Sequence, residues 1–399
     1  MQRCEALARH SELPGGLTRV FLSPENRAAN DLVLGWMREA GMAAKLDAIG
    51  NVAGRYEGEQ PGLPCLMLGS HLDTVRNAGK YDGMLGVVTA IECVDFLNSE
   101  KIRLPFALEV IGFGDEEGVR FGTTMLGSRA VAGGLDPSVL KTKDAKGISI
   151  EQALRDFGLQ PEQIADVRRK RSDVLAYAEL HIEQGPVLEA EGLPVGVVTA
   201  INGFSRLRVT LSGMAGHAGT VPMHLRRDAL AAAAECVLAV ERIAKSKSEL
   251  VGTVGKIEAS PGAINVIPGD VTFTIDVRAP KDSLRNAAVA AAESEVKKIS
   301  EKRTIRCDIE HLQSLGVAEC APRLMQQLER AVASKGFKVR RLPSGAGHDG
   351  MALKSVADIC MLFVRCKDGI SHNPAESITQ ADAGAGAQVL LEFIEKFQV

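Results

Sequence analysis

Three histidines stand at the ends of apolar runs, in polar or glycine-rich surroundings. They are His71 in GSHLDTV, His181 in ELHIEQGP and His372 in GISHNPAES. His71 follows the run CLMLGS directly, and ligands of open α/β sheets bind beyond the carboxyl ends of the strands. Asp73 comes two residues later, so we expect its carboxylate to accept a hydrogen bond from the second imidazole nitrogen of His71. With this HxD pattern, His71 fits the role of a metal ligand as well as it fits that of a structural histidine.

Carboxylates stand beside two other apolar segments. Asp82 in KYDGMLG precedes a helical pattern, where a helix-capping aspartate is the simpler interpretation. Asp115, Glu116 and Glu117 in FGDEEG follow the run ALEVIGF. Three adjacent carboxylates repel one another and need water or a cation. Together with the histidines, these acids form a mixed imidazole and carboxylate set suited to Zn²⁺ or Mn²⁺, in which one shared carboxylate could bridge two ions.

Both ends of the chain alternate apolar runs with helical patterns. A helix is predicted over 23–37, because SPE places a capping serine, a proline and an acid at its start. Strands are predicted at 65–69, 106–113, 174–182 and 358–364, and further helices at 84–97 and 381–397. This alternation predicts an α/β fold with a mostly parallel sheet covered by helices.

The middle of the chain has a different order of elements. It is predicted as strand 205–211, helix 226–245, strand 250–258, strand 271–277, helix 282–302 and strand 304–312. The order βαββαβ is that of a ferredoxin-like α+β unit. We therefore expect an inserted domain over 204–317, within a discontinuous larger domain built from 1–203 and 318–399.

Composition narrows the class of partner. The chain has 399 residues, and 47 basic against 50 acidic side chains give a net charge of −3. Without a basic excess, a nucleic-acid partner is not expected. No apolar stretch is long enough for a signal peptide or a membrane span, and the eight cysteines are scattered like reduced thiols. We expect a cytoplasmic protein with a small-molecule partner.

Nine short segments carry a specific resemblance. They are GSHLDTV, YDGMLG, GDEEG, HIEQGP, AGHAGTVPM, INVIPG, DVRAP, SGAGHD and FVRCKDGISHNPAE. Together they resemble the hydantoinase/carbamoylase branch of the M20 metallopeptidase family, whose members cleave ureido or related C–N bonds. The resemblance implies a zinc-peptidase-like catalytic domain, with the inserted domain acting as a lid and a dimerisation domain in a homodimer.

The resemblance also implies a centre of two divalent metal ions, Zn or Mn. His71, Asp82 and His181 would hold one ion, and Asp82, Glu117 and His372 the other, with Asp82 as the bridge. Two such ions lower the pKa of a shared water and polarise a ureido carbonyl. Glu116 is the expected general base, and Asp73 a supporting catalytic residue.

The substrate-side candidates follow from the same resemblance. Arg278 offers a guanidinium fork to the carboxylate that the branch's substrates carry, although an arginine paired with a neighbouring aspartate is the simpler interpretation. Asn265 would donate its amide to the same carboxylate. His217 would stabilise the oxyanion, reaching across from a partner subunit. Gln184 would contact the ureido group, and the backbone at Gly347 would lie beside the carboxylate.

Four functions remain open at this stage. The first choice is an allantoate amidohydrolase, which forms ureidoglycine, ammonia and carbon dioxide, because GHAGTVPM and FVRCKDGISH resemble the allantoate enzymes. The alternative is an N-carbamoyl-L-amino acid hydrolase. More distant alternatives are an M20 dipeptidase or aminopeptidase and a non-catalytic binding protein, although none of the expected ligand positions is replaced.

Overall fold

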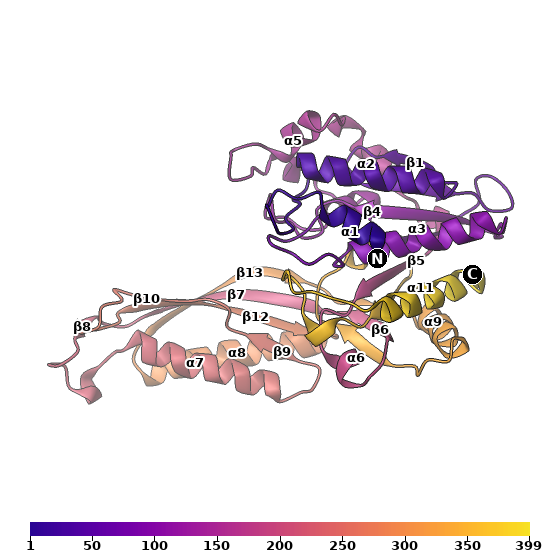
Figure 1. The fold of residues 1–399 in the computed structure, drawn as a ribbon. Helices are drawn as coiled ribbons and strands as arrows, with labels where there is room; N and C mark the ends of the chain where they lie inside the picture. Colours follow the sequence, from indigo (N-terminus) through magenta and orange to yellow (C-terminus); the bar gives the residue numbers. More distant parts are fainter. The chain divides into compact units, whose positions relative to one another are not determined.

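The computed structural model describes residues 1–399 and divides them into two compact units (Figure 1). Unit 1 comprises Met1–Thr199 and Glu319–Val399, and unit 2 comprises Ala200–Ala318. Each unit has a sheet and an apolar core of its own. The domain boundaries expected from the sequence, 204 and 317, lie within a few residues of these limits.

Unit 1 is built on a nine-stranded sheet with the order β1-β2-β4-β3-β5-β16-β6-β14, and β15 also pairs with β6. Its strands are β1 (Ala43–Leu46), β2 (Val52–Tyr56), β3 (Cys65–His71), β4 (Ala107–Phe113), β5 (Val174–Ile182), β6 (Val195–Ile201), β14 (Ala318–Glu319), β15 (Arg341–Ser344) and β16 (Ile359–Val364). The central strands β4, β3, β5 and β16 are parallel, while β1, β2 and β6 pair antiparallel with their neighbours. The mostly parallel centre predicted from the sequence is confirmed.

The helices of unit 1 cover this sheet. They are α1 (Gln2–Ala8), α2 (Pro24–Glu39), α3 (Met84–Ser99), α4 (Leu126–Val131), α5 (Ile150–Asp156), α6 (Val187–Ala190), α9 (Pro322–Ser334), α10 (Gly350–Leu353) and α11 (Gln380–Glu395). Short 3-10 helices lie at Pro137–Lys141, Pro161–Val167, Arg171–Asp173 and Lys367–Gly369. As predicted, Ser23 caps α2 by accepting the N–H of Asn26. Every residue of β3, β4 and β16 is buried, which explains their uninterrupted apolar runs.

The register of the parallel strands places the candidate ligands that end β3, β4 and β5 at the same height along the sheet. His71 ends β3 and pairs with Phe113 at the end of β4, just before the acidic run 115–117. Leu68 of β3 pairs with Ala178 of β5, so His181 lies as far along β5 as His71 lies along β3. The carboxyl ends of these strands therefore form one edge, where α/β proteins bind their ligands.

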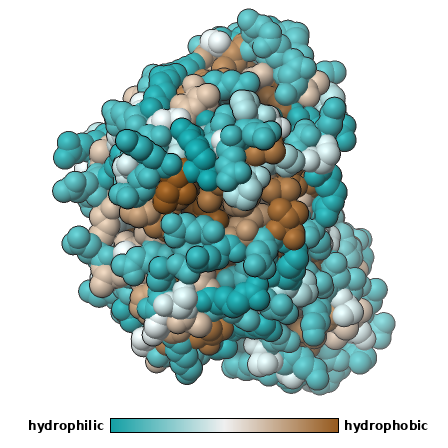
Figure 2. All heavy atoms as spheres, turned by 90° about the vertical axis from the view of Figure 1, so that its right-hand side faces the viewer, coloured by the Kyte–Doolittle hydropathy of each residue, from teal (hydrophilic) through white to brown (hydrophobic).

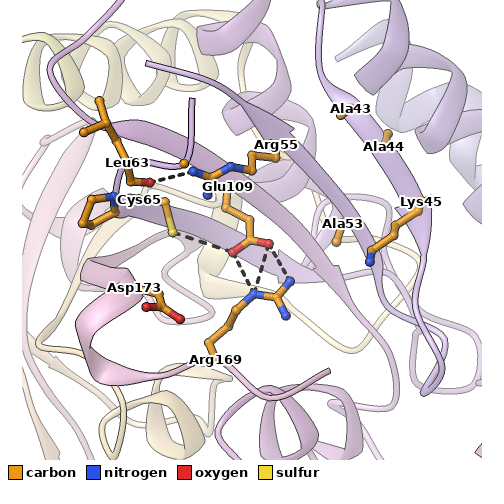
Figure 3. A pocket seen from close by; sticks show the side chains of 12 residues that line it. Ala43, Ala44, Lys45, Ala53, Arg55, Leu63, Cys65, Glu109, Arg169 and Asp173 are labelled. Carbon is orange, nitrogen blue, oxygen red and sulfur yellow. Dashed lines mark hydrogen bonds and ion pairs between the residues drawn. The ribbon is translucent and has the colours of Figure 1, made fainter. Parts of the chain in front are cut away.

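The opposite end of the same sheet carries a different set of charges. Glu109 of β4 is buried and receives three hydrogen bonds from two nitrogens of the Arg169 guanidinium, with Nη2 2.6 Å from Oε1 (Figure 3). The Cys65 thiol lies 3.7 Å from the same carboxylate, and Arg55 donates to the carbonyl of Leu63. These residues line a hollow at the amino ends of β3 and β4. The length of the strands separates this hollow from the histidines.

Unit 2 has a five-stranded antiparallel sheet with the order β10-β12-β7-β13, in which β9 also pairs with β12. Its strands are β7 (Gly203–Ser212), β9 (Val251–Thr253), β10 (Ile257–Ser260), β12 (Asp270–Ala279) and β13 (Arg306–Leu315), and β8 (Gly216–His217) pairs separately with β11 (Val266–Ile267). Two long helices, α7 (Ala229–Lys245) and α8 (Asp282–Lys302), pack on the sheet, and a 3-10 helix lies at Met223–Leu225. The long elements follow the predicted βαββαβ order, but the strand expected at 250–258 is split into β9 and β10, and the short pair β8–β11 was not predicted.

Charged and polar side chains cover most of the face shown in Figure 2, and apolar side chains gather near its centre. None of the helices combines the length and the apolar character needed to cross a membrane.

The contact between α3 and β5 generates a stability prediction. A Cβ atom on Gly86 of α3 would lie 2.2 Å from the carbonyl oxygen of Leu180, next to His181, so alanine at this position must push the helix away from the strand. We expect Gly86→Ala to lower the free energy of unfolding by about 1–3 kcal/mol. Gly35→Ala on α2 is the matched control, because no atom lies within 4 Å of its added Cβ.

The control variant should gain stability, by about 0.5–1 kcal/mol, since alanine loses less conformational freedom than glycine in a helix. Thermal denaturation of the two variants and the parent protein measures both changes. A Gly86→Ala melting temperature at or above that of the parent would contradict the proposed close contact.

Candidate metal centre

Asp82 lies at the centre of the predicted ligand set. Its Oδ1 atom is 3.5 Å from His71 Nε2 and 3.2 Å from His181 Nε2. Its Oδ2 atom is 3.2 Å from His372 Nε2, which is also 3.4 Å from Glu117 Oε1. The structure therefore gathers two overlapping groups, His71–Asp82–His181 and Asp82–Glu117–His372, which share the aspartate.

The spacing of these atoms fits ligands around common ions. Two ligand atoms bound about 2.05 Å from one tetrahedral ion lie roughly 3.3 Å apart. The ligand atoms of each group lie within 4.8 Å of one another, and the closest contacts, those to Asp82, are 3.2–3.5 Å long. His181 Nε2 is buried and makes no hydrogen bond. The donor set and this orphaned nitrogen both suit a divalent cation such as Zn²⁺ or Mn²⁺.

Backbone carbonyls orient two of the imidazole rings. His71 Nδ1 lies 3.0 Å from the carbonyl oxygen of Asp73, and His181 Nδ1 lies 2.9 Å from that of Ile182. Because a carbonyl only accepts, each Nδ1 must carry the proton, and each Nε2 is left to face Asp82 as a lone-pair donor. This is the tautomer that a metal-binding histidine needs.

Burial and neighbouring charges perturb the whole cluster. Burial opposes the charged form of Asp82, but the neighbouring imidazoles of His181, His372 and His71 outweigh it and hold the Asp82 pKa well below its usual value. Burial also raises the pKa of Glu117 to about 7 and that of Glu116 well above its usual range. Buried acids with raised pKa values beside imidazoles form a site that a cation would neutralise.

The structure rules out the simpler interpretation of Asp82 and corrects the expected contact of Asp73. Asp82 does not cap α3, because the capping residue is Gly83 and no side chain bonds the helix start. The Asp73 carboxylate lies 3.9 Å from His71 Nδ1, too far for the predicted hydrogen bond. It accepts instead the backbone N–H groups of Glu116 and Glu117, at 3.1 and 3.2 Å. These donors draw the carboxylate away from the ring, so Asp73 orients the acidic loop through its side chain and His71 through its backbone.

Glu116 sits beside the two groups without belonging to either. One of its carboxylate oxygens lies within ligand spacing of His71 and Glu117. A Cβ atom placed on Gly347 would lie 3.9 Å from Glu116 Oε1, so the glycine loop borders this carboxylate. The preceding Asp115 is fully buried, has a left-handed φ of 61° and leaves both carboxylate oxygens without a hydrogen bond. Such strain is typical of functional sites.

Gln184 is also brought to the cluster. Its Nε2 donates to Asp82 Oδ2 at 2.9 Å, while its Oε1 is buried without a partner. Gln184 and His372 have left-handed φ values of 55° and 54°. The Gln184 Oε1 atom is therefore a hydrogen-bond acceptor that no protein donor satisfies.

The candidates in unit 2 lie at opposite ends of its sheet. His217 and Asn265 adjoin each other at the exposed β8–β11 strand pair, beyond the Asp270 end of β12 (Figure 1). Arg278 lies near the other end of β12, a strand of ten residues and roughly 30 Å at about 3.3 Å per residue. The Arg278 guanidinium is paired with Asp276, as the simpler interpretation had it. Within one chain, Asn265 and Arg278 therefore cannot hold the same carboxylate.

Sequence reasoning missed residues that surround the ligands. Glu179 is buried and accepts hydrogen bonds from Ser70 and Tyr177, both at 2.9 Å. Together with His181 and His348 it has ligand-like spacing, but its two oxygens already have these donors. The HxD pattern did not point to Glu179. The available signal was its position two residues before His181, which places both side chains on the same side of β5.

Glu376 and Ser371 were missed as well. Glu376 Oε1 accepts the backbone N–H groups of Tyr81 and Asp82, and the Ser371 hydroxyl lies 2.8 Å from Asp82 Oδ2. Both residues stand in the segment ISHNPAES that contains His372. Their presence in that segment was the available signal.

Comparisons with known proteins agree with this geometry. The model of peptidase family M20/M25/M40 matches residues 67–396. An N-carbamoyl-L-amino acid amidohydrolase from Geobacillus stearothermophilus is 44% identical over 390 residues, covering 98% of this chain and 95% of that protein. Allantoate deiminase 1 from Glycine max is 41% identical over 424 residues, covering 98% of this chain and 88% of that protein.

A solved structure shows the same fold over nearly the whole chain. The amidase of the hydantoinase/carbamoylase family from Burkholderia multivorans superposes with a TM-score of 0.93 at 35% identity, covering 98% of this chain and 95% of that one. The resemblance carried by the nine motifs is thereby confirmed. The chain belongs to peptidase family M20/M25/M40, in its hydantoinase/carbamoylase group, and is a hydrolase of C–N bonds other than peptide bonds.

Proposed function

We propose that this hydrolase uses two divalent metal ions to cleave a ureido C–N bond in a small substrate that carries a carboxylate. The observation that carries the proposal is the Asp82 carboxylate, whose two oxygens face two separate ligand groups. A carboxylate shared in this way holds two ions close together, as two-metal hydrolases require.

The residues of unit 1 divide the chemical work. His71, Asp82 and His181 would hold one ion, and Asp82, Glu117 and His372 the other. When bound, Zn²⁺ or Mn²⁺ supplies Lewis acidity, which lowers the pKa of water and polarises a carbonyl. The buried Glu116 carboxylate, whose pKa burial raises, would accept the proton of the attacking water and return it to the departing nitrogen.

Substrate recognition would involve both units. The unpartnered Gln184 Oε1 would accept an N–H of the ureido group. Arg278 would bind the carboxylate, in competition with Asp276. Because His217 and Asn265 lie at the other end of unit 2, they would act on the site of a second copy of the chain, with unit 2 serving as lid and dimerisation domain in a homodimer.

Allantoate is our first choice of substrate, with formation of ureidoglycine, ammonia and carbon dioxide. The segments GHAGTVPM and FVRCKDGISH support this choice. Relatives named for allantoate and for N-carbamoyl-L-amino acids are similarly distant, at 41% and 44% identity. An N-carbamoyl-L-amino acid hydrolase is therefore the second candidate.

The metal content tests the shared-aspartate arrangement. We expect elemental analysis of protein reloaded after chelation to find two ions per chain, and chelation to abolish ammonia release. His372→Ala removes a ligand of one group only, so it should lower the content to about one ion per chain. Protein that binds no metal, or a His372→Ala variant that retains both ions, would contradict the assignment.

Two adjacent glutamates allow a matched test of the general base. Glu116→Gln should keep both ions and lower kcat by about 10²–10⁴-fold, because the amide cannot take up the proton. Glu117→Gln should lose metal as well as activity. Metal loss in Glu116→Gln, or unchanged kcat, would count against the role of Glu116.

The substrate is tested with a small panel. Ammonia release is measured with allantoate, ureidoglycolate, N-carbamoyl-L-amino acids and N-carbamoyl-β-alanine, and amine release with a dipeptide. We expect the highest kcat/KM with allantoate, because the segments GHAGTVPM and FVRCKDGISH of this chain resemble those of the allantoate enzymes. Higher kcat/KM with an N-carbamoyl-L-amino acid would select the second candidate, and activity on the dipeptide alone would overturn the ureido assignment.

A further inference from the structure

One buried carboxylate beside the candidate metal centre faces the protein backbone instead of the ligand cluster. Glu376 Oε1 accepts the N–H of Tyr81 at 2.8 Å and that of Asp82 at 3.2 Å. Glu376 is 5% exposed and belongs to none of the groups with ligand spacing. Its carboxylate therefore binds the backbone of the shared aspartate, 294 residues away in the chain.

A serine links the same carboxylate to the side chain of Asp82. The Ser371 hydroxyl lies 3.0 Å from Glu376 Oε2 and 2.8 Å from Asp82 Oδ2. Because Ser371 directly precedes His372, the loop that carries one candidate ligand is tied to the loop that carries another. Asp82 is thus held at its backbone and at one carboxylate oxygen by a single pair of residues.

The surrounding backbone is shaped to admit Glu376. A Cβ atom on Gly79 would lie 2.2 Å from Glu376 Cδ and 2.3 Å from its Oε1, so only glycine lets this loop close over the carboxylate. On the other side, the backbone N–H of Glu376 donates to the carbonyl of Asn373, and Asn373 Oδ1 accepts the N–H of Ala375. Both loops are therefore built around the contact.

We infer that Glu376, acting with Ser371, is a positioning residue that fixes the shared Asp82 carboxylate and couples the Asp82 loop to the His372 loop. The inference rests on the proposed metal role of Asp82. Without Glu376, two buried N–H groups would lack an acceptor, and the loop would rearrange to find one. Residues that orient metal ligands typically change metal affinity by about 10–100-fold when replaced.

The geometry also predicts which replacement of Glu376 preserves its hydrogen bonds and therefore the Zn²⁺ affinity. In Glu376→Gln, the amide oxygen can accept both backbone N–H groups, while Nε2 donates to Ser371 Oγ, whose proton remains available to Asp82. Glu376→Ala removes every one of these contacts. Asp228→Ala in unit 2 is a matched control, because Asp228 is also a carboxylate that accepts two backbone N–H groups, those of Leu230 and Ala231.

The experiment measures Zn²⁺ affinity by competition with a chromogenic chelator, first for the parent protein and then for the variants. We expect a loss of about 10–100-fold for Glu376→Ala, and values within about threefold of the parent for Glu376→Gln and Asp228→Ala. Parent protein that binds no Zn²⁺ would overturn the metal proposal itself. A bound parent with unchanged affinity in Glu376→Ala would overturn only the role of Glu376, as would equal losses in the glutamine and alanine variants.

A second readout needs no metal. Hydrogen exchange of the metal-free protein should show faster exchange at the Tyr81 and Asp82 amides in Glu376→Ala, and no change there in Asp228→Ala. Should Glu376→Ala fail to fold, Ser371→Ala decides: it removes only the hydroxyl and should weaken Zn²⁺ binding by about three- to tenfold. Unchanged Zn²⁺ affinity in that variant would contradict the coupling of the two loops.

Discussion

The structure of unit 1 depends on the sharing of one buried carboxylate, that of Asp82, by three imidazoles. A buried charge is tolerated only when it is paired and hydrogen-bonded. Here the Nε2 atoms of His71, His181 and His372 lie 3.2–3.5 Å from the carboxylate, where bound ions would supply the pairing, and Gln184 and Ser371 supply hydrogen bonds. The same two oxygens that need these partners present two separate faces, which is why one aspartate can serve two candidate ions.

The sheet and the loops contribute to this arrangement in different ways. Parallel pairing of β3 with β4 and β5 brings His71, His181 and the acidic run to one edge, within a buried and rigid frame. The loops then adopt uncommon backbone conformations, with left-handed φ values at Asp115, Gln184 and His372. Strained residues persist where the surrounding structure determines them fully, and here Asp73 and Glu376 hold the neighbouring backbone from buried positions.

Unit 2 shows why a complete set of motifs does not define a site within one chain. Its three candidate substrate residues, His217, Asn265 and Arg278, all occupy the segments that resemble the family. The extended strand β12 nevertheless keeps the β8–β11 pair, with His217 and Asn265, far from Arg278. A stiff strand cannot be shortened, so a site that uses all three residues needs a second copy of the chain.

Sequence patterns predicted the long buried elements and the residue types of the cluster. Apolar periodicity located β5 and α3 almost to the residue, because burial on a parallel sheet imposes continuous apolar runs, and residue types at strand ends identified His71, Glu117 and His181. The groups that the carboxylates bind became apparent only in the folded chain. The Asp73 carboxylate accepts the backbone N–H groups of residues 116 and 117, and the Glu376 carboxylate accepts that of Asp82. These partners are separated by 43 and 294 residues, and no local pattern encodes a hydrogen bond that exists only once distant loops are packed together.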